Sequence, residues 1–283
     1  MAASKEVAVE PAGPVVSDLR TNGYAIFPNV LTSSQIDQLR GIVASHLGGY
    51  GRPRYGGRFQ LRSMNRDPAL ARLLSCSAIA EVMKSCTSPD DPVLTGECDI
   101  MADTTSSWHK DITSDMGLDG AIYRDATFQV FKLAIYLQDQ PAGSRSALKV
   151  RPGTHLRTDG EEMPATALPI RRGDVAVFDV RINHAGQLPT LGERLAHRLA
   201  VWFARALGGD PEVTYTRLRE NYRALMAKRQ SRLAVFMTFG PNGPALQAYE
   251  KAGRHRHGPL PADIDAAAVA DFAAQGVRIV QAT

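Results

Sequence analysis

Short apolar runs make up the middle of the chain from about residue 92 onward. β-Branched and aromatic residues are frequent in these runs, and turn-rich segments separate them. Regular short strands with such turns are typical of a sandwich or a barrel rather than of alternating strand–helix units. The strands that this pattern predicts are residues 92–101, 128–139, 147–153, 174–182 and 197–207.

The N-terminal part has a different pattern. Residues 23–31 form a short apolar run bounded by glycine and proline, which predicts one strand. In residues 32–47 the apolar positions recur at helical spacing, and Thr32, Ser33 or Ser34 is available as the N-cap. We therefore expect a strand followed directly by a helix.

Helical spacing returns in three later segments. They are residues 68–86, much of residues 210–237, and a short helix within residues 263–280. Residues 48–68 are rich in glycine and arginine and predict a loop. Helices are thus expected on both sides of the β-rich centre.

We expect one domain over residues 15–283, because a chain of this length can bury about three quarters of its unfolded surface without disulfides. Within it we predict an N-terminal helical layer at about residues 15–90. The β-rich core is predicted at about residues 92–207, and a C-terminal helical part at about residues 210–283. The Ala-, Pro- and Glu-rich residues 1–14 are expected to be mobile.

Composition narrows the class of protein. The chain has 283 residues, 44% of them hydrophobic, and a net charge of +4 from 33 basic and 29 acidic residues. This small, dispersed excess gives no indication of a nucleic-acid partner. Cys76, Cys86 and Cys98 include no CxxC pair, so a reducing cytoplasm fits better than a disulfide framework. No segment has the pattern of a secretory signal or a membrane span, so we expect a cytoplasmic protein without a membrane partner.

Residues 108–111, Trp-His-Lys-Asp, place His109 and Asp111 two positions apart. On an extended segment such residues face the same side, so the imidazole and the carboxylate point at one position. A second histidine would complete the two-histidine, one-carboxylate triad that holds Fe(II) and leaves coordination positions open. Taken alone, the pair is more typical of a surface strand with a half-buried histidine and a solvated aspartate.

The third ligand must come from elsewhere in the chain. His184 ends a predicted strand and precedes a turn-rich stretch, which is where barrel enzymes carry ligands. His155 follows a Pro-Gly turn and is the main alternative. Of the remaining histidines, His46 lies in a predicted helix, His197 opens the predicted strand at residues 197–207, and His255 and His257 lie in a basic tail.

Five segments carry, in order, the motifs of a known enzyme family. They are LRTNGYAIFPNVLTSSQIDQLR, WHKD, KLAIYLQDQPAGSRSALKVRPGTH, GDVAVFDVRINHAGQ and HRLAVWFARA. Together they resemble the phytanoyl-CoA dioxygenase family of Fe(II)- and 2-oxoglutarate-dependent oxygenases over roughly residues 15–240. The distal His-Ala-Gly-Gln departs from the family pattern, because it lacks the serine usually found two residues after the histidine.

The resemblance implies a mainly β fold with surrounding helices and a double-stranded β-helix (jelly-roll, cupin-like) core. It also implies that His109, Asp111 and His184 bind Fe(II), with 2-oxoglutarate and O2 as cosubstrates. The far carboxylate of 2-oxoglutarate needs a cation, and arginine offers a planar bidentate fork. We expect Arg198 in this role rather than Arg194, because Arg198 opens a predicted strand and Arg194 lies in a turn-like stretch.

Lys132 is a second candidate for contacting 2-oxoglutarate. It is a charge inside an apolar predicted strand. Its side chain either reaches 2-oxoglutarate inside the barrel or faces solvent from an edge strand, and the sequence does not choose between the two.

The resemblance implies an enzyme that oxidises an unactivated C–H bond of a small organic molecule and releases succinate and CO2. Related halogenases replace the carboxylate ligand by a small residue, so Asp111 favours hydroxylation or another oxidation, such as desaturation, cyclisation or epimerisation. The Ala-, Arg-, Gly- and Pro-rich composition favours a natural-product intermediate as substrate. A non-catalytic β-barrel binding protein and a redox-inert metal isomerase remain alternatives, and both a monomer and a homodimer remain open.

Overall fold

The computed structural model describes residues 15–112, 122, 125, 127–225, 231–257 and 262–280. The predicted mobile segment, residues 1–14, lies outside this part of the chain.

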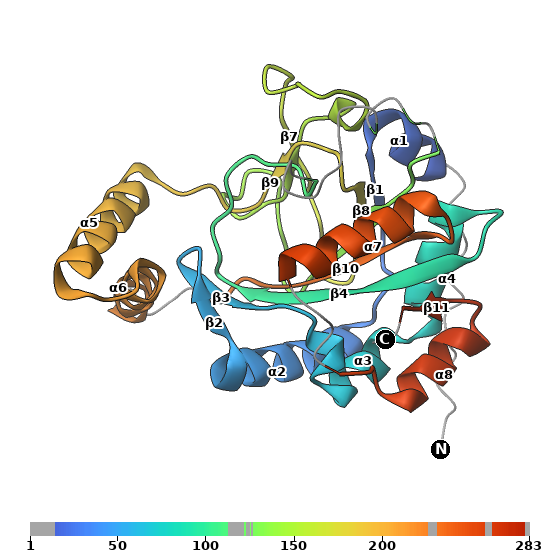
Figure 1. Cartoon of the computed structure of the whole chain (residues 1–283), viewed down its shortest axis with the longest axis horizontal. Helices are drawn as coiled ribbons and strands as arrows, with labels where there is room; N and C mark the ends of the chain where they lie inside the picture. Colours follow the sequence, from blue (N-terminus) through green and yellow to red (C-terminus); the bar gives the residue numbers. More distant parts are fainter. Residues whose placement is uncertain are drawn as a thin grey trace.

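A large sheet forms the centre of the molecule (Figure 1). Seven of its strands follow the order β1-β8-β5-β10-β4-β3-β2 with antiparallel neighbours, and β11 pairs in parallel with β4. The strands are β1 (Tyr24–Phe27), β2 (Arg52–Arg54), β3 (Gly57–Gln60), β4 (Pro92–Ala102), β5 (Phe131–Tyr136), β8 (Val175–Asp179), β10 (Leu233–Pro241) and β11 (Arg278–Ile279).

A smaller sheet has the order β7-β6-β9, with β6 (Lys149–Val150), β7 (Thr166–Ala167) and β9 (His184–Ala185). In Figure 1 it lies on one side of β4 and β10, while α2 (Ser33–Tyr50) and α3 (Pro68–Leu74) lie on the other. The protein therefore has the predicted jelly-roll fold: mainly antiparallel β-structure with helices around it.

The central strands of the large sheet are buried on both faces, so their sequences are nearly continuous apolar runs. On β5, Leu133 and Ile135 belong to the core under the helices. Ala134 and Tyr136 alternate with them and face the small sheet together with Phe178 of β8. This inner face is the one that can present polar groups to a site inside the barrel.

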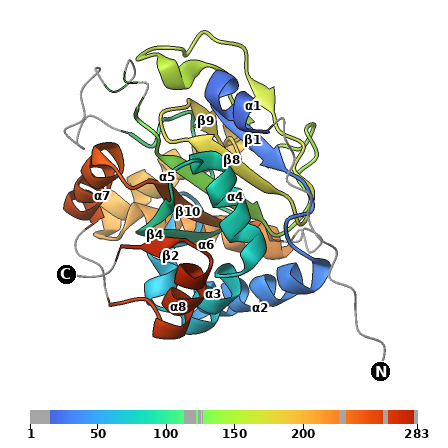
Figure 2. The ribbon, with the colours of Figure 1, turned by 90° about the vertical axis from the view of Figure 1, so that its right-hand side faces the viewer.

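The helical layer covers the outer face of the sheet (Figure 2). The prediction for α2 is confirmed: it buries the apolar positions of residues 32–47, and Thr32 forms a capping box with Gln35. The other members of this layer are α1 (Val15–Asn22), α4 (Ser77–Thr87) and α8 (Ala266–Ala274).

The predicted strand at residues 197–207 is wrong. These residues belong to helix α5 (Leu191–Leu207), which pairs with α6 (Pro211–Leu225) and projects from the body of the molecule in Figure 1. Two local signals fix this helix. Thr190 and Glu193 form a capping box at its start, and Gly208, with φ of 71°, provides its left-handed C-cap.

A central strand was also missed. Residues 233–241 form β10, which lies between β5 and β4, whereas the sequence pattern predicted helix over much of residues 210–237 and no strand there. The β-core therefore does not end near residue 207, and the α5–α6 hairpin is an insertion between β9 and β10.

Two smaller corrections apply. The predicted loop at residues 48–68 contains the β2–β3 hairpin, and the tail contains helix α7 (Pro244–His257).

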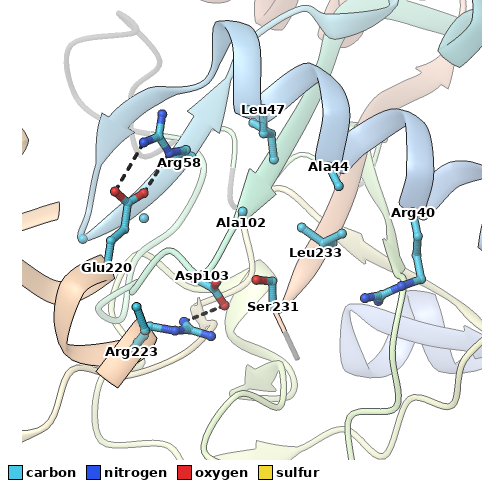
Figure 3. A pocket seen from close by; sticks show the side chains of 14 residues that line it. Arg40, Ala44, Leu47, Arg58, Ala102, Asp103, Glu220, Arg223, Ser231 and Leu233 are labelled. Atoms are coloured by element: carbon cyan, nitrogen blue, oxygen red, sulfur yellow. Dashed lines mark hydrogen bonds and ion pairs between the residues drawn. The ribbon is translucent and has the colours of Figure 1, made fainter. Parts of the chain in front are cut away.

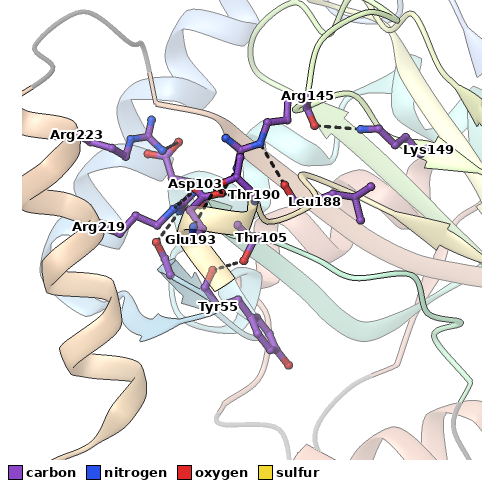
Figure 4. Close-up of polar contacts among 11 residues, drawn as sticks. Tyr55, Asp103, Thr105, Arg145, Lys149, Leu188, Thr190, Glu193, Arg219 and Arg223 are labelled. Atoms are coloured by element: carbon purple, nitrogen blue, oxygen red, sulfur yellow. Dashed lines mark hydrogen bonds and ion pairs between the residues drawn. The ribbon is translucent and has the colours of Figure 1, made fainter. Parts of the chain in front are cut away.

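Charged contacts attach the α5–α6 hairpin to the body (Figure 4). Glu193 of α5 pairs with Arg145 from the loop before β6 and with Arg219 of α6, the latter at 2.9 Å. Arg219 is buried and also donates to the carbonyl oxygen of Asp103 at the end of β4. The carboxylate of Asp103 in turn binds Arg223 of α6 at 2.6 Å.

Candidate metal centre

Backbone pairing brings the two predicted histidine ligands together. The N–H of His109 donates to the carbonyl of His184 at 3.0 Å, and the N–H of His184 donates back to His109 at 2.9 Å. The N–H of Asp111 donates to the carbonyl of Val180, so the extended segment continues for two residues. Directly opposed residues of an antiparallel pair project to the same side, and the ring centres of the two histidines are 4.3 Å apart.

The side-chain atoms of this triad converge. Oδ1 of Asp111 lies 3.5 Å from Nε2 of His109 and 3.7 Å from Nε2 of His184. One ligand atom from each residue lies within 4.8 Å of the others. Donors about 2 Å from a common ion lie roughly 3 Å apart, so a small movement inward would place one divalent metal among them.

Both imidazoles are already oriented for this role. Nδ1 of His109 donates to the carbonyl of Ser107 at 2.8 Å, and Nδ1 of His184 donates to the carbonyl of Ile182 at 3.1 Å. A carbonyl oxygen only accepts, so the proton resides on Nδ1 and each Nε2 keeps its lone pair. Such contacts fix the tautomer and ring direction of metal-ligating histidines.

The ionisation states of the triad residues also favour the binding of a metal cation. Burial opposes ionisation of Asp111, but Lys132 and His184 hold the pKa of this carboxyl well below its usual range. Burial lowers the pKa of His184 to about 4. Burial also acts to lower the pKa of His109, but its hydrogen bond and charge interaction with Asp111 raise it above the ordinary value. At neutral pH the site therefore contains a carboxylate and a neutral His184, as metal binding requires.

Lys132 lies directly behind the carboxylate ligand. Its Nζ is 3.4 Å from Oδ2 of Asp111 and 3.6 Å from Oε2 of Glu97. The alternative of a solvent-facing edge strand is wrong, because β5 lies between β8 and β10 and only 13% of the lysine side chain is exposed. Glu97 Oε2 accepts further hydrogen bonds from Thr238 at 2.9 Å and from the Tyr249 hydroxyl at 3.2 Å.

Three residues of this buried cluster were missed from the sequence: Glu97, Asp99 and Tyr249. A signal for two of them was present, because Glu97 and Asp99 interrupt an apolar strand at the same two-residue spacing as the His109–Asp111 pair. Burial raises the pKa of Asp99 to about 7, against the opposing charge of Lys132.

The other histidines lie away from the triad. His155 is buried, and its Nε2 lies 3.0 Å from the carbonyl of Arg20, next to Gly23. His46 and His197 each contact a carboxylate instead. The side chains of His255 and His257 lie outside the part of the chain that the structure describes.

The structure overturns the argument for Arg198. Both Arg198 and Arg194 are exposed on α5, so Arg198 does not stand at the mouth of a buried strand. Arg232 is the arginine that stands at the start of a buried strand. It is 6% exposed and directly precedes β10. Its guanidinium carbon lies 5.0 Å from the centre of the Tyr136 ring on the inner face of the barrel.

Arg232 also lies beside the metal-ligand strand. A Cβ built on Gly186, two residues after His184, would lie only 3.2 Å from Nη2 of Arg232. Nε of Arg232 donates to the carbonyl of Ser146 at 3.2 Å, and within the described residues no ion pair joins its guanidinium to a carboxylate. An arginine of this kind is a cation available to an incoming acid.

A cleft of about 820 Å³ lies elsewhere, between α2, the β2–β3 hairpin and α6 (Figure 3). Leu233 lines it, whereas the preceding Arg232 faces the barrel interior. Its acidic side chains are paired: Glu220 with Arg58 at 2.8 Å, and Asp103 with Arg223. The triad does not line this cleft.

Several solved structures have the same fold, among them non-heme α-ketoglutarate-dependent enzymes from nogalamycin biosynthesis. HygX from Streptomyces hygroscopicus, with nickel, 2-oxoglutarate and hygromycin B bound, gives a TM-score of 0.56 at 14% identity over 82% of this chain and 88% of its own. The α-ketoglutarate-dependent carbocyclase SnoK from nogalamycin biosynthesis gives 0.54 at 18% identity, over 84% and 87%. The epimerase SnoN from the same biosynthesis gives 0.53 at 15% identity, over 82% and 86%.

No family model matches the chain, and no curated protein matches it. At these identities the likeness to solved structures establishes the fold. No helix among the described residues is both long and apolar enough to span a membrane.

Proposed function

We propose that the protein is an Fe(II)- and 2-oxoglutarate-dependent oxygenase that oxidises a C–H bond of a small organic molecule. The observation that carries the proposal is the convergence of His109, Asp111 and His184 on one point, with both Nδ1 atoms bonded to carbonyl oxygens and both Nε2 atoms close to Oδ1 of Asp111. Two histidines and one carboxylate form the donor set of non-heme Fe(II) oxygenases, and they leave positions open for a cosubstrate and oxygen.

Each residue of the site has a stated task in this proposal. The triad would hold Fe(II), and Arg232 would bind the far carboxylate of 2-oxoglutarate through its planar fork. When bound, the iron and 2-oxoglutarate supply the oxidising chemistry. The walls of the barrel around Tyr136 and Phe178 exclude water and hold the substrate in place.

Hydroxylation is the outcome we propose first, since Asp111 supplies the carboxylate that related halogenases replace by a small residue. The similar structures include an epimerase and a carbocyclase, so epimerisation or oxidative cyclisation at the same site is the second candidate. HygX and SnoN were solved with hygromycin B and nogalamycin RO, which supports a natural-product intermediate as the substrate class. The three free thiols support a reducing compartment.

The test is the spectrum of the anaerobic protein with Fe(II) and 2-oxoglutarate. Chelation of the iron by the 2-oxo acid should give a weak visible charge-transfer band, which a binding protein or a redox-inert isomerase would not show. His184→Ala should lose both the band and stoichiometric iron. His155→Ala is the matched control and should retain them. If His184→Ala binds iron like the wild type, the triad assignment fails.

A further inference from the structure

A buried line of polar groups joins helix α7 to the metal centre. The hydroxyl of Tyr249 on α7 and the hydroxyl of Thr238 on β10 both donate to Oε2 of Glu97. The ammonium of Lys132 lies between this oxygen, at 3.6 Å, and Oδ2 of Asp111, at 3.4 Å. The elements β4, β5, β10 and α7 thus hold one lysine against one metal-ligand candidate.

The two oxygens of Asp111 have different surroundings. Oδ1 faces the Nε2 atoms of His109 and His184. Oδ2 is buried, faces Lys132, and has no hydrogen-bond partner among the described residues. A buried carboxylate oxygen without a hydrogen bond is costly, so a nearby ammonium strongly favours this orientation.

We infer that Lys132 is a positioning residue that retains Oδ2 of Asp111, so that Asp111 gives the metal only Oδ1, and that Glu97 holds Lys132 in place. This inference rests on the proposed function of the triad. The orientation of Asp111 determines how many coordination positions of the metal remain open. Three protein donors and the two donor atoms of 2-oxoglutarate leave one of six positions for oxygen, and an Asp111 bound through both oxygens would occupy it.

Co(II) alone, without 2-oxoglutarate, tests the inference. The visible absorption of high-spin Co(II) depends on its coordination geometry and on its ligand atoms. Lys132→Met keeps the length of the side chain and removes its charge. We expect this variant to bind one Co(II) with a metal-only spectrum that differs from that of the wild type, because a second carboxylate oxygen replaces a water ligand, and to bind 2-oxoglutarate at least about tenfold more weakly, because a position is occupied.

A second variant covers the case in which Lys132→Met does not fold. Glu97→Gln leaves Lys132 charged and keeps the shape of the side chain, but it loosens the hold on the ammonium. We expect a smaller change of the Co(II) spectrum in the same direction. Arg58→Met removes an ion pair of 2.8 Å at the edge of the sheet and should leave the spectrum unchanged.

The outcomes separate the alternatives. A wild-type protein that binds no stoichiometric Co(II) would contradict the proposed function itself. If the wild type binds Co(II) and both variants keep its metal-only spectrum, the positioning role is refuted. Weaker 2-oxoglutarate binding with an unchanged metal-only spectrum would instead show that Lys132 contacts the cosubstrate directly, and it too overturns the inference.

Discussion

At the level of single residues, Arg232 and Arg198 lead to opposite expectations for 2-oxoglutarate binding. Arg232 is buried at the start of β10, whereas Arg198 is exposed on α5. Losing a buried charged partner costs about 3–5 kcal/mol, so Arg232→Ala should weaken binding at least about 100-fold. Arg198→Ala should change it little. Anaerobic titration of 2-oxoglutarate into the metal-loaded variants measures both, and a large loss for Arg198 alone would restore the original assignment.

Metal affinity should depend on pH through one histidine. A metal binds only neutral imidazole. His184, with a pKa of about 4, is already neutral at pH 6, whereas His109 has a raised pKa and is protonated there. Affinity should therefore rise about tenfold per pH unit between roughly pH 5 and 6.5, with one proton released, whereas two titrating ligands would give about a hundredfold.

Isothermal titration with Ni(II) at several pH values measures this slope. Asp99 titrates nearby, with a pKa raised by burial to about 7, so the series should be repeated with Asp99→Asn. A slope of two protons in both proteins would mean that His184 is charged in the metal-free site.

The two-residue spacing of His109 and Asp111 is visible in the sequence, and the resemblance to the family's motifs favoured His184 over His155 as the third ligand. The contacts around the triad could not be predicted. Glu97 and Tyr249 meet only because β4 lies beside β10 and α7 packs nearby, across about 150 positions of sequence. The sequence around Glu97 and Tyr249 gives no indication that the two residues are in contact.

At the level of elements, one tetrapeptide illustrates why the core boundaries were mistaken. Arg-Leu-Ala-Val occurs at residues 198–201 in helix α5 and again at residues 232–235, where it leads into strand β10. Apolar content alone cannot separate the two cases. Tertiary pairing decides the second, while the Thr190–Glu193 capping box decides the first.

Helix α5 buries its small residues and exposes its large ones. Ala200 is fully buried, whereas Leu195 is 58% and Trp202 63% exposed. Leu195→Gln should therefore change the free energy of unfolding by less than about 0.5 kcal/mol. Ala200→Leu should lower it by about 1–3 kcal/mol, because the added atoms have no room. Urea unfolding compares the two, and a large loss for Leu195→Gln would show that its side chain is covered in solution.

At the level of the whole molecule, stability should differ between the barrel and the α5–α6 hairpin. Helices α5 and α6 pack mainly on each other, and the hairpin contacts the body through the packing of α6 on β2 and β3 and through the Glu193–Arg145 ion pair. Strand β10, in contrast, is hydrogen-bonded on both sides within the sheet. Amide hydrogens of α5 should exchange with deuterium much faster than those of β10, because local opening exposes the hairpin without disturbing the core. Mass spectrometry of peptides after exchange tests this, and equal protection would show that the hairpin belongs to the cooperative core.

The central position of β10 in the sheet also determines when the protein can fold during its synthesis. During synthesis β5 emerges about 100 residues, and β4 about 130 residues, before the strand that joins them. Until residue 241 leaves the ribosome, these two strands keep unpaired edges, which are templates for association with other chains. The nascent protein therefore cannot close its barrel or assemble the complete site, Arg232 included, until most of its length is present.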